Sequence, residues 1–265
     1  MQLPSIFNYI GILITLRCNF KCSYCLNWRM NGRDEKDAEY WLKAIDRIET
    51  DLPITLSGGE PSVHKAFFPI LTNLNKKFDL LTNLSFDIDY FIENVSVYKF
   101  ENDKGYAPIR VSYHPGFSEK INVIERVRKL MDNGYRVGVY VVETKENKHM
   151  IKDLKKIDWL DLQVKPYLPH EAKVGGRKEK QCAITELIVG PDGNIYKCHR
   201  DLYKGEYPIG QLLNVEDVNY CYRHCDNADE CHPCDIKEKR DRFGNPNYTS
   251  VHIVKPKEEN TNEIR

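Results

Sequence analysis

Ile10-Gly-Ile-Leu-Ile-Thr-Leu16 runs almost directly into Cys18-Asn-Phe-Lys-Cys22-Ser-Tyr-Cys25, and this stretch predicts a buried strand followed by a metal centre. A short apolar run of this kind is typical of a fully buried strand. Three closely spaced thiolates can hold three corners of a cubane iron–sulfur cluster. The missing fourth protein ligand then leaves one iron open to a small molecule.

A zinc site or a disulfide framework could also account for closely spaced cysteines. Zinc would need a fourth Cys or His at finger spacing, and the nearest histidine, His64, lies far downstream. Disulfides fit poorly, because no signal peptide precedes the cysteines and the chain's nine cysteines are an odd number. An iron–sulfur cluster is therefore the favoured interpretation.

A second motif, Ser57-Gly58-Gly59-Glu60-Pro61, follows the short apolar run Pro53-Ile-Thr-Leu56. Glycines let the backbone approach a ligand closely, and a carboxylate can accept hydrogen bonds from an ammonium group. An ordinary strand-to-helix turn is the simpler alternative for this motif taken alone.

Apolar period and turn residues predict strands that alternate with helices. The expected strands are 10–17, 53–57, 78–82, 109–114, 135–143 and 160–166. The expected helices are 37–50, 66–77, 89–95, 118–133 and 147–157, with Ser118 and Asn147 as N-caps and Asn133-Gly134 as a stop. This alternation favours parallel βαβ units.

The C-x3-C-x2-C motif after the first strand, together with Gly-Gly-Glu-Pro after the second, resembles the signature of the radical S-adenosylmethionine (radical SAM) enzymes. The resemblance implies a partial (β/α)6 TIM-type barrel over residues 1–170, with Cys18, Cys22 and Cys25 on a 4Fe-4S cluster. It also implies that the cluster binds SAM, and that SAM is cleaved when a donor such as a flavodoxin or ferredoxin supplies one electron to the cluster. In that family the resulting 5′-deoxyadenosyl radical abstracts hydrogen from the substrate, and the same is expected here.

The same resemblance implies a set of residues around SAM. The amino group would lie at Gly58, Gly59 and Glu60, and the adenine beside Tyr24. The carboxylate and ribose would be contacted by Asn83, Ser112 and Glu143.

Alternation along two expected strands predicts a polar barrel interior, because successive side chains face opposite sides. One set comprises Arg110, Ser112 and His114, and the other comprises Gln163, Lys165 and Tyr167. Polar side chains in a lumen favour a polar substrate, although any one of them can instead make internal hydrogen bonds. His114, Lys165 and Tyr167 are the candidates for a catalytic base.

The remaining six cysteines lie beyond residue 170, where the strand and helix alternation stops. A β-hairpin turning at Gly190-Pro-Asp-Gly193 is expected between Cys182 and Cys198. This arrangement resembles the opening of the SPASM or twitch extension of radical SAM enzymes. Residues 171–253 are accordingly expected to form an auxiliary-cluster domain, and 254–265 a charged, disordered tail.

The resemblance implies one auxiliary 4Fe-4S cluster, because the later spacing C-x3-C-x5-C-x2-C departs from the full SPASM pattern. The favoured ligands are Cys182, Cys198, Cys231 and Cys234, with Cys221 and Cys225 as possible ones. A second auxiliary cluster would need ligands other than cysteine, for which His199, His224 and His232 are nearby. A zinc ribbon on Cys221, Cys225, Cys231 and Cys234 is the alternative.

Composition sets limits on partners. Lys+Arg and Asp+Glu are equal at 39 each, so nothing indicates a nucleic-acid or membrane-surface partner. No apolar run is long enough to span a bilayer, and the unpaired cysteines favour a reducing cytoplasm.

Three functions follow. Because about nine residues precede the first strand, a peptide-recognition domain is not expected there. The first function is a dehydrogenase-like radical SAM oxidoreductase that oxidises or rearranges a polar small molecule, sugar- or cyclitol-like, with help from the auxiliary cluster. The second is a peptide-modifying radical SAM maturase. The third, of another class, is a non-catalytic iron–sulfur protein or a zinc-stapled binding protein.

Overall fold

The structure is a computed structural model. It describes residues 7, 9–25, 34–102, 105–167, 180–184, 186–218, 223–225 and 251–254. At 180–184, 215–217, 223–225 and 251–254 the backbone alone is described. Of the helices in these ranges, none is both long and apolar enough to cross a membrane.

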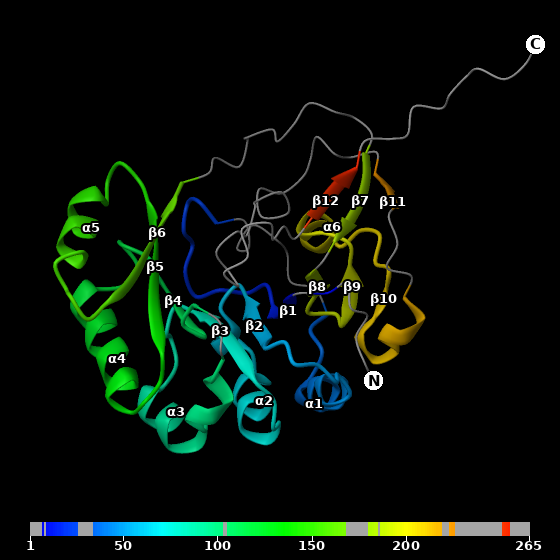
Figure 1. The fold of residues 1–265 in the computed structure, drawn as a ribbon, viewed down its shortest axis with the longest axis horizontal. Helices are drawn as coiled ribbons and strands as arrows, with labels where there is room; N and C mark the ends of the chain where they lie inside the picture. Colours follow the sequence, from blue (N-terminus) through cyan, green and yellow to red (C-terminus); the bar gives the residue numbers. More distant parts are fainter. Residues whose placement is uncertain are drawn as a thin grey trace, which may run out of the picture.

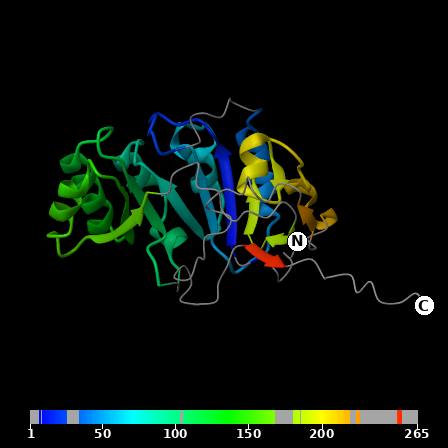
Figure 2. The ribbon, with the colours of Figure 1, turned by 90° about the horizontal axis from the view of Figure 1, so that it is seen from above.

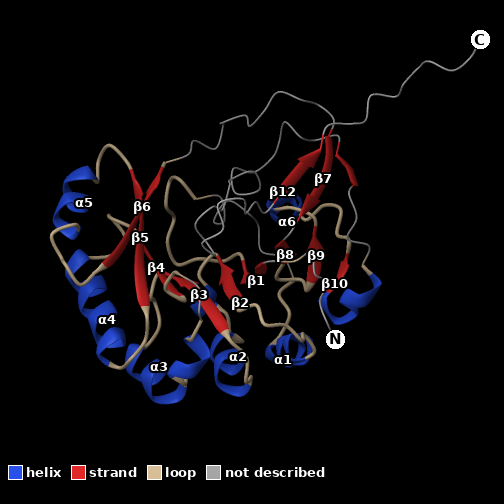
Figure 3. Ribbon diagram, in the orientation of Figure 1, coloured by secondary structure: helices blue, strands red, loops and turns tan. Residues whose placement is uncertain are grey.

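Six parallel strands pair in chain order and form the main part of one sheet (Figure 1). They are β1 (Tyr9–Thr15), β2 (Ile54–Gly58), β3 (Phe78–Thr82), β4 (Ile109–Tyr113), β5 (Val137–Glu143) and β6 (Asp161–Pro166). Five helices connect them and follow one side of the sheet (Figure 3). They are α1 (Ala38–Asp46), α2 (Phe67–Asn73), α3 (Ile88–Asn94), α4 (Lys120–Asp132) and α5 (Lys148–Leu154). The expected α/β fold with a mostly parallel sheet is confirmed.

Local chemistry explains several helix ends. Asp37 and Asp87 are N-caps whose carboxylates accept hydrogen bonds from the first-turn amides of α1 and α3. Asn147 is the expected N-cap of α5, and α4 ends at Asn133 and Gly134, where Gly134 has φ +89°. The expectation for Ser118 was wrong: α4 begins two residues later, and its N-cap is Glu119.

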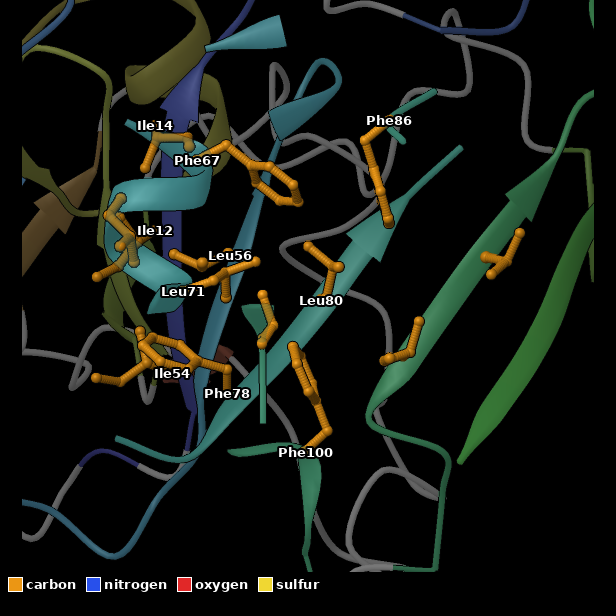
Figure 4. Close-up of a cluster of buried hydrophobic side chains, with 14 of the residues drawn as sticks. Ile12, Ile14, Ile54, Leu56, Phe67, Leu71, Phe78, Leu80, Phe86 and Phe100 are labelled. Carbon is orange, nitrogen blue, oxygen red and sulfur yellow. The ribbon is translucent and has the colours of Figure 1, made fainter. Parts of the chain in front are cut away.

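The core lies between the sheet and the helices. The strands contribute alternate residues to it (Figure 4), with Ile12 and Ile14 from β1 next to Ile54 and Leu56 from β2. The strand registers align these positions, since Ile10 pairs with Ile54 and Ile54 with Phe78. The opposite face of β1 to β6 is therefore the lumen of a partial barrel, and it carries Thr55, Asp79, Arg110 and Ser112.

Beyond β6 the sheet continues on the other side of β1 (Figure 2). β8 (Glu186–Val189) pairs in parallel with β1, then antiparallel with β9 (Asn194–Tyr196), which pairs with β10 (Gly210–Gln211). The expected hairpin is therefore present, but it extends the barrel sheet itself. A small apolar group covers this end, formed by Leu13, Leu16, Ile188, Tyr196 and Leu202.

The C-terminal part contains further regular elements. They are α6 (His199–Lys204), the 3-10 helix η4 (Leu212–Asp217) and β11 (Arg223–Cys225). A separate three-stranded sheet joins β11 and β12 (Val251–Val254) to β7 (Lys180–Ile184). The tail 255–265 lies outside the described residues.

Candidate functional site

The three cysteines of the first motif lie on the loop that leaves the carboxyl end of β1. A turn closes the loop, because the Cys25 amide donates to the Cys22 carbonyl oxygen over 3.0 Å. None of the three cysteines is in a disulfide bond among the described residues, and Cys22 is buried. Burial and the neighbouring thiols Cys25 and Cys18 raise the pKa of Cys22 to about 11.

These thiols fit a cluster chemically. As thiolates they would repel one another in a partly buried place, so a cationic iron centre is what would compensate them. Among the described residues no three His, Cys, Asp or Glu side chains gather tightly enough for a single metal ion. A cubane has less need of such closeness, because each thiolate binds a different iron.

The glycines of the second motif allow β2 to end against the start of the cysteine loop. The Gly59 amide donates to the Thr15 carbonyl and the Glu60 amide to the Arg17 carbonyl, each over 2.9 Å. A Cβ on Gly59 would lie 2.2 Å from the Arg17 carbonyl oxygen, and one on Gly58, where φ is +144°, would lie 2.0 Å from the Thr15 oxygen. Both glycines are therefore needed for the strand ends to meet.

The Glu60 carboxylate is 1% exposed and lies between two strand ends. Oε1 accepts from the Ser62 amide and hydroxyl over 3.2 and 2.7 Å and from the Thr82 hydroxyl over 2.8 Å. Oε2 accepts from the Asn83 amide over 2.6 Å. Burial raises the pKa of Glu60, and these hydrogen bonds oppose the rise. Within the described residues Glu60 thus links the β2 turn to the end of β3.

Asn83 joins β3 to the cysteine loop. Its Nδ2 donates to Asn19 Oδ1 over 2.9 Å, and its Oδ1 accepts from Ser85. Asn19, which lies between two of the cysteines, in turn donates to the Ser85 hydroxyl over 2.7 Å. The loop is therefore fixed from the β3 side.

The loop is also fixed from the β4 side by aromatic contacts. A hydrogen bond of 2.7 Å joins the Tyr24 hydroxyl to Nδ1 of His114, and the two rings stack at 5.9 Å. Phe20 meets the His114 ring edge-on and stacks on Phe117 at 5.4 Å. Burial lowers the pKa of His114 to about 4. The structure thus places His114 beneath the loop, in contact with the residue expected beside adenine.

Sequence reasoning missed Glu35, which fixes the return of the chain after the cysteine loop. Its carboxylate accepts from the Thr15 hydroxyl and from Arg17, over 3.0 Å from Nε and 2.6 Å from Nη2. His64 Nε2 lies 3.5 Å away. His64 Nδ1 accepts from the Ala66 amide, so Nε2 carries the proton that faces Glu35. The sequence signal that could have pointed to Glu35 is an acidic residue that follows the cysteine loop, in which Arg17 can pair with it.

The lumen contains a buried ion pair. Arg110 Nη2 lies 3.2 Å from Asp79 Oδ2 and also donates to the Tyr9 and Thr55 hydroxyls over 3.2 and 3.4 Å. Tyr106 donates to the same carboxylate oxygen over 2.6 Å. Arg110 therefore makes internal hydrogen bonds, which was the alternative to substrate contact that the sequence left open for each polar lumen residue.

Nearer the carboxyl ends, the lumen face of β4 to β6 is more exposed, since Ser112 and Tyr140 are half-buried and Gln163 is exposed. The register places Ser112 beside Tyr140 and Tyr140 beside Gln163, so all three share this face. Lys165 Nζ lies 5.4 Å from the centre of the Tyr140 ring, and Tyr167 is 45% exposed.

Glu143 is not brought together with Ser112, Tyr140 and Gln163, but it lines a pocket with Tyr167. It lies on the same face of β5 as Val137, Val139 and Val141, which pack in the core on the helix side. Its carboxylate lies 3.6 Å from Lys148 Nζ.

The cysteines expected at an auxiliary cluster are only partly described. Cys198 is in no disulfide bond among the described residues and caps α6, its sulfur accepting from the Asp201 amide. Cys182 pairs with Arg223, and Cys225 with Lys180, in the separate three-stranded sheet. Cys221, Cys231, Cys234 and His232 lie outside the described residues.

Comparisons with known proteins agree with this geometry. The model of the radical SAM superfamily matches residues 12–178. A GTP 3′,8-cyclase of Nautilia profundicola is 28% identical over 172 residues, which cover 58% of this chain and 51% of that protein. One of Clostridium perfringens is 25% identical over 206 residues, covering 68% and 61%. The chain thus spans about half or somewhat more of the length of these two relatives.

Solved structures show the same fold. Native anSMEcpe with bound AdoMet and Kp18Cys peptide superposes with a TM-score of 0.56 at 13% identity, covering 80% of both chains. The complex with Cp18Cys peptide gives 0.53 at 15% identity, covering 89% of this chain and 86% of that one.

Proposed function

The chain belongs to the radical SAM superfamily, and from this premise we propose that it uses SAM to abstract hydrogen from a polar small molecule held in its lumen. The family implies a 4Fe-4S cluster and SAM. The observation that carries the proposal is the loop of three closely spaced cysteines, fixed by contacts from β1, β2, β3 and β4.

Cys18, Cys22 and Cys25 would hold the cluster. When bound, the cluster and SAM supply the electron transfer and the organic radical, while the protein orients them and excludes water. The protein's own residues keep the site rigid, since Gly59, Glu60 and their hydrogen-bond partners hold the strand ends together. The SAM contacts expected at Gly58, Gly59, Glu60, Asn83, Ser112, Tyr24 and Glu143 remain proposals. Glu60 and Asn83 also have the structural roles described above.

We place the substrate against the lumen face of β4 to β6, where Ser112, Tyr140 and Gln163 lie side by side. Hydroxyl, phenol and amide groups on a partly exposed face suit a ligand with several hydroxyl groups. Lys165 is the base candidate on this face, whereas Tyr167 lines a pocket with Glu143 and Val164. His114 is the weaker candidate, because Tyr24 occupies its Nδ1.

The substrate class is a proposal. The sugar or cyclitol expected from the sequence has no counterpart in the names of the relatives, which are GTP 3′,8-cyclases. We therefore widen the class to polar small molecules with hydroxyl groups, including nucleotides. A peptide is the second candidate, favoured by the peptide-bound complexes of anSMEcpe.

An auxiliary 4Fe-4S cluster that takes one electron from the substrate radical also remains a proposal. It would use Cys198 and Cys182, with Cys231 and Cys234 or with Cys221 and Cys225. The position of Cys198 directly after the β8–β9 hairpin supports it. The net reaction would then be an oxidation, with the electron leaving to the cluster and the proton to a base.

The test is anaerobic reconstitution followed by addition of SAM and dithionite. We expect 5′-deoxyadenosine, and about eight irons per chain if one auxiliary cluster is present. Cys22→Ser should abolish cleavage, whereas the matched variant Cys198→Ser should retain it and lose about half of the iron. Iron near zero without cleavage would instead support a zinc-stapled or other non-catalytic protein.

The substrate is identified by transfer of deuterium. Deuterated nucleotides, polyols and cysteine-containing peptides are supplied in turn, and the mass of 5′-deoxyadenosine is measured. A gain of one mass unit with a peptide alone would overturn the small-molecule proposal.

A further inference from the structure

The turn between β3 and α3 has a strained backbone at Leu84. Leu84 has φ +61°, and it is one of two residues other than glycine with a positive φ among the described residues. A leucine in this left-handed region has a conformational cost that the surrounding structure has to offset. The Leu84 side chain is buried in the core, and the Leu84 amide donates to the Thr82 hydroxyl over 2.9 Å. These contacts hold the turn from the core and from the end of β3.

Arg126 holds the same turn from the other side. It lies on α4, which packs beside α3, and its Nη2 donates to the Leu84 carbonyl oxygen over 2.7 Å and to the Phe86 carbonyl oxygen. Its Nε is buried and has no hydrogen-bond partner within the described ranges. Burial lowers the pKa of Arg126, and the attraction of Asp87 and Asp89 opposes this only in part. A partly desolvated cation is thus held against two carbonyl groups of a strained turn.

Asn83 is the residue that this turn directs toward the cysteine loop. Its backbone amide donates to Glu60 Oε2 over 2.6 Å, and its Oδ1 accepts from the Ser85 amide over 3.0 Å. Its Nδ2 carries two hydrogens, and one of them goes to Asn19 Oδ1 over 2.9 Å. In the part of the chain that the structure describes, the second hydrogen has no acceptor. It remains for a ligand beside the cysteine loop.

We propose that Arg126 is a positioning residue for SAM: by holding the Leu84 turn, it sets the direction in which the Asn83 side-chain amide faces the cofactor. The inference rests on the proposed function, in which Asn83 contacts SAM. Without the two hydrogen bonds from Arg126, Leu84 can relax from φ +61° toward the negative φ that a leucine prefers. A change of φ at Leu84 rotates the peptide that precedes it, so Asn83 turns away.

A purely structural role is the competing explanation, because Arg126 also ties α4 to an earlier part of the chain. The two explanations differ in where the effect of a substitution appears. A structural role lowers the stability of the whole fold. A positioning role loosens the turn, weakens SAM and leaves iron loading alone.

Amide hydrogen exchange of the cluster-free protein tests the turn itself. Arg126→Met should speed exchange at the Leu84 and Ser85 amides by about tenfold and leave the amides of β5 unchanged, because the opening is local. Arg128→Met is the matched control, since Arg128 lies two residues further along α4 with 52% of its side chain exposed. It should alter neither set of amides. Equal acceleration in the turn and in β5 would overturn the proposal in favour of the structural role.

Binding of SAM to the reconstituted protein is then measured by anaerobic equilibrium dialysis, with iron counted in every variant. Arg126→Met should raise the dissociation constant of SAM by about tenfold, the scale of one hydrogen bond to a charged group, at unchanged iron per chain. Arg126→Lys keeps the charge but loses the fork that spans two carbonyl groups, so its increase should be smaller. An unchanged dissociation constant in Arg126→Met contradicts the proposal, whether or not iron is lost.

Asn83→Ala tests the route of the effect. If Arg126 acts through Asn83, Arg126→Met should raise the dissociation constant no further once residue 83 is alanine. Effects that multiply in the double variant would refute the proposal, because Arg126 would then act on SAM by another route. If Asn83→Ala does not load iron, the exchange measurement and Arg126→Lys still decide the question.

The two proposals fail separately. If the unsubstituted protein cleaves no SAM with dithionite, the proposed function fails. If it does cleave SAM, and Arg126→Met and Arg128→Met bind SAM equally well, only the role of Arg126 fails.

Discussion

Replacement of Asp79 by asparagine should destabilise the fold strongly. Asp79 is fully buried, and its partner Arg110 has 8% of its side chain exposed. Breaking a buried pair by removal of one partner costs about 3–5 kcal/mol, because the remaining charge is left uncompensated. An asparagine amide would also face at least one of the donors Asn102, Tyr106 and Arg110. For a chain of this size the loss corresponds to a fall in Tm of roughly 6–20 °C.

The assay is urea unfolding of the cluster-free protein at neutral pH, followed by tryptophan fluorescence, to which the fully buried Trp41 contributes. Asp132→Asn is the matched control, since Asp132 pairs with Arg128 on the surface, with side chains 57% and 52% exposed. It should change the free energy of unfolding by less than about 1 kcal/mol. The double variant Asp79→Asn/Arg110→Met should cost less than the sum of the two single variants.

Two outcomes would refute this reasoning. A free-energy change below about 1 kcal/mol for Asp79→Asn would mean that the pair contributes no more than a surface pair. Strict additivity in the double variant would mean that the two charges do not interact.

Three further predictions concern the site. Gly59→Ala should lower the iron bound per chain, because the added Cβ would meet backbone oxygen at 2.2 Å, whereas Gly105→Ala, with no atom within 4 Å, should load iron normally. Burial raises the pKa of Glu35, but hydrogen bonds from its neighbours outweigh burial, so the net shift of the pKa is downward from 4.5. The stabilisation that Glu35 provides should be complete above pH 4.5 and lost as the pH falls through the lowered pKa. The urea midpoint of Glu35→Gln should therefore lack this acid step. Tyr24→Phe should cost about 0.5–1.5 kcal/mol in urea unfolding, whereas Tyr113→Phe should cost nothing, because the buried Tyr113 hydroxyl has no hydrogen-bond partner among the described residues.

Strand positions could be predicted from sequence where alternation and turn residues agree. β3 occupies 78–82, as expected, and the other five parallel strands deviate by at most two residues at either end. Helix ends were harder. The first helix was expected to reach residue 50 but ends at Asp46. Ile48 keeps the helical period and is fully buried, yet it lies past the helix, so the period alone does not tell where a helix stops.

The site could be predicted where its residues are close in sequence. The cysteine and glycine motifs can be identified from their spacing in the sequence, but the hydrogen-bond partners of Glu60 cannot. Thr82 and Asn83 come from the next strand, and only the parallel register brings them to Glu60. Glu35 was missed for the same reason, because Thr15 and Arg17 reach it through the closure of a loop.

His114 shows why residue type and strand position are insufficient to assign a catalytic base. Its place in the polar alternating set of the expected strand 109–114 made it a candidate. However, burial lowers its pKa to about 4, and a group of that pKa is a weak base near neutral pH. Its Nδ1 is already joined to Tyr24. A histidine in this state orients the loop between the cysteines, whereas proton removal is better suited to a side chain that still faces the lumen. Substitution of His114 should therefore alter iron loading before it alters product formation per loaded cluster, and substitution of Lys165 should do the reverse.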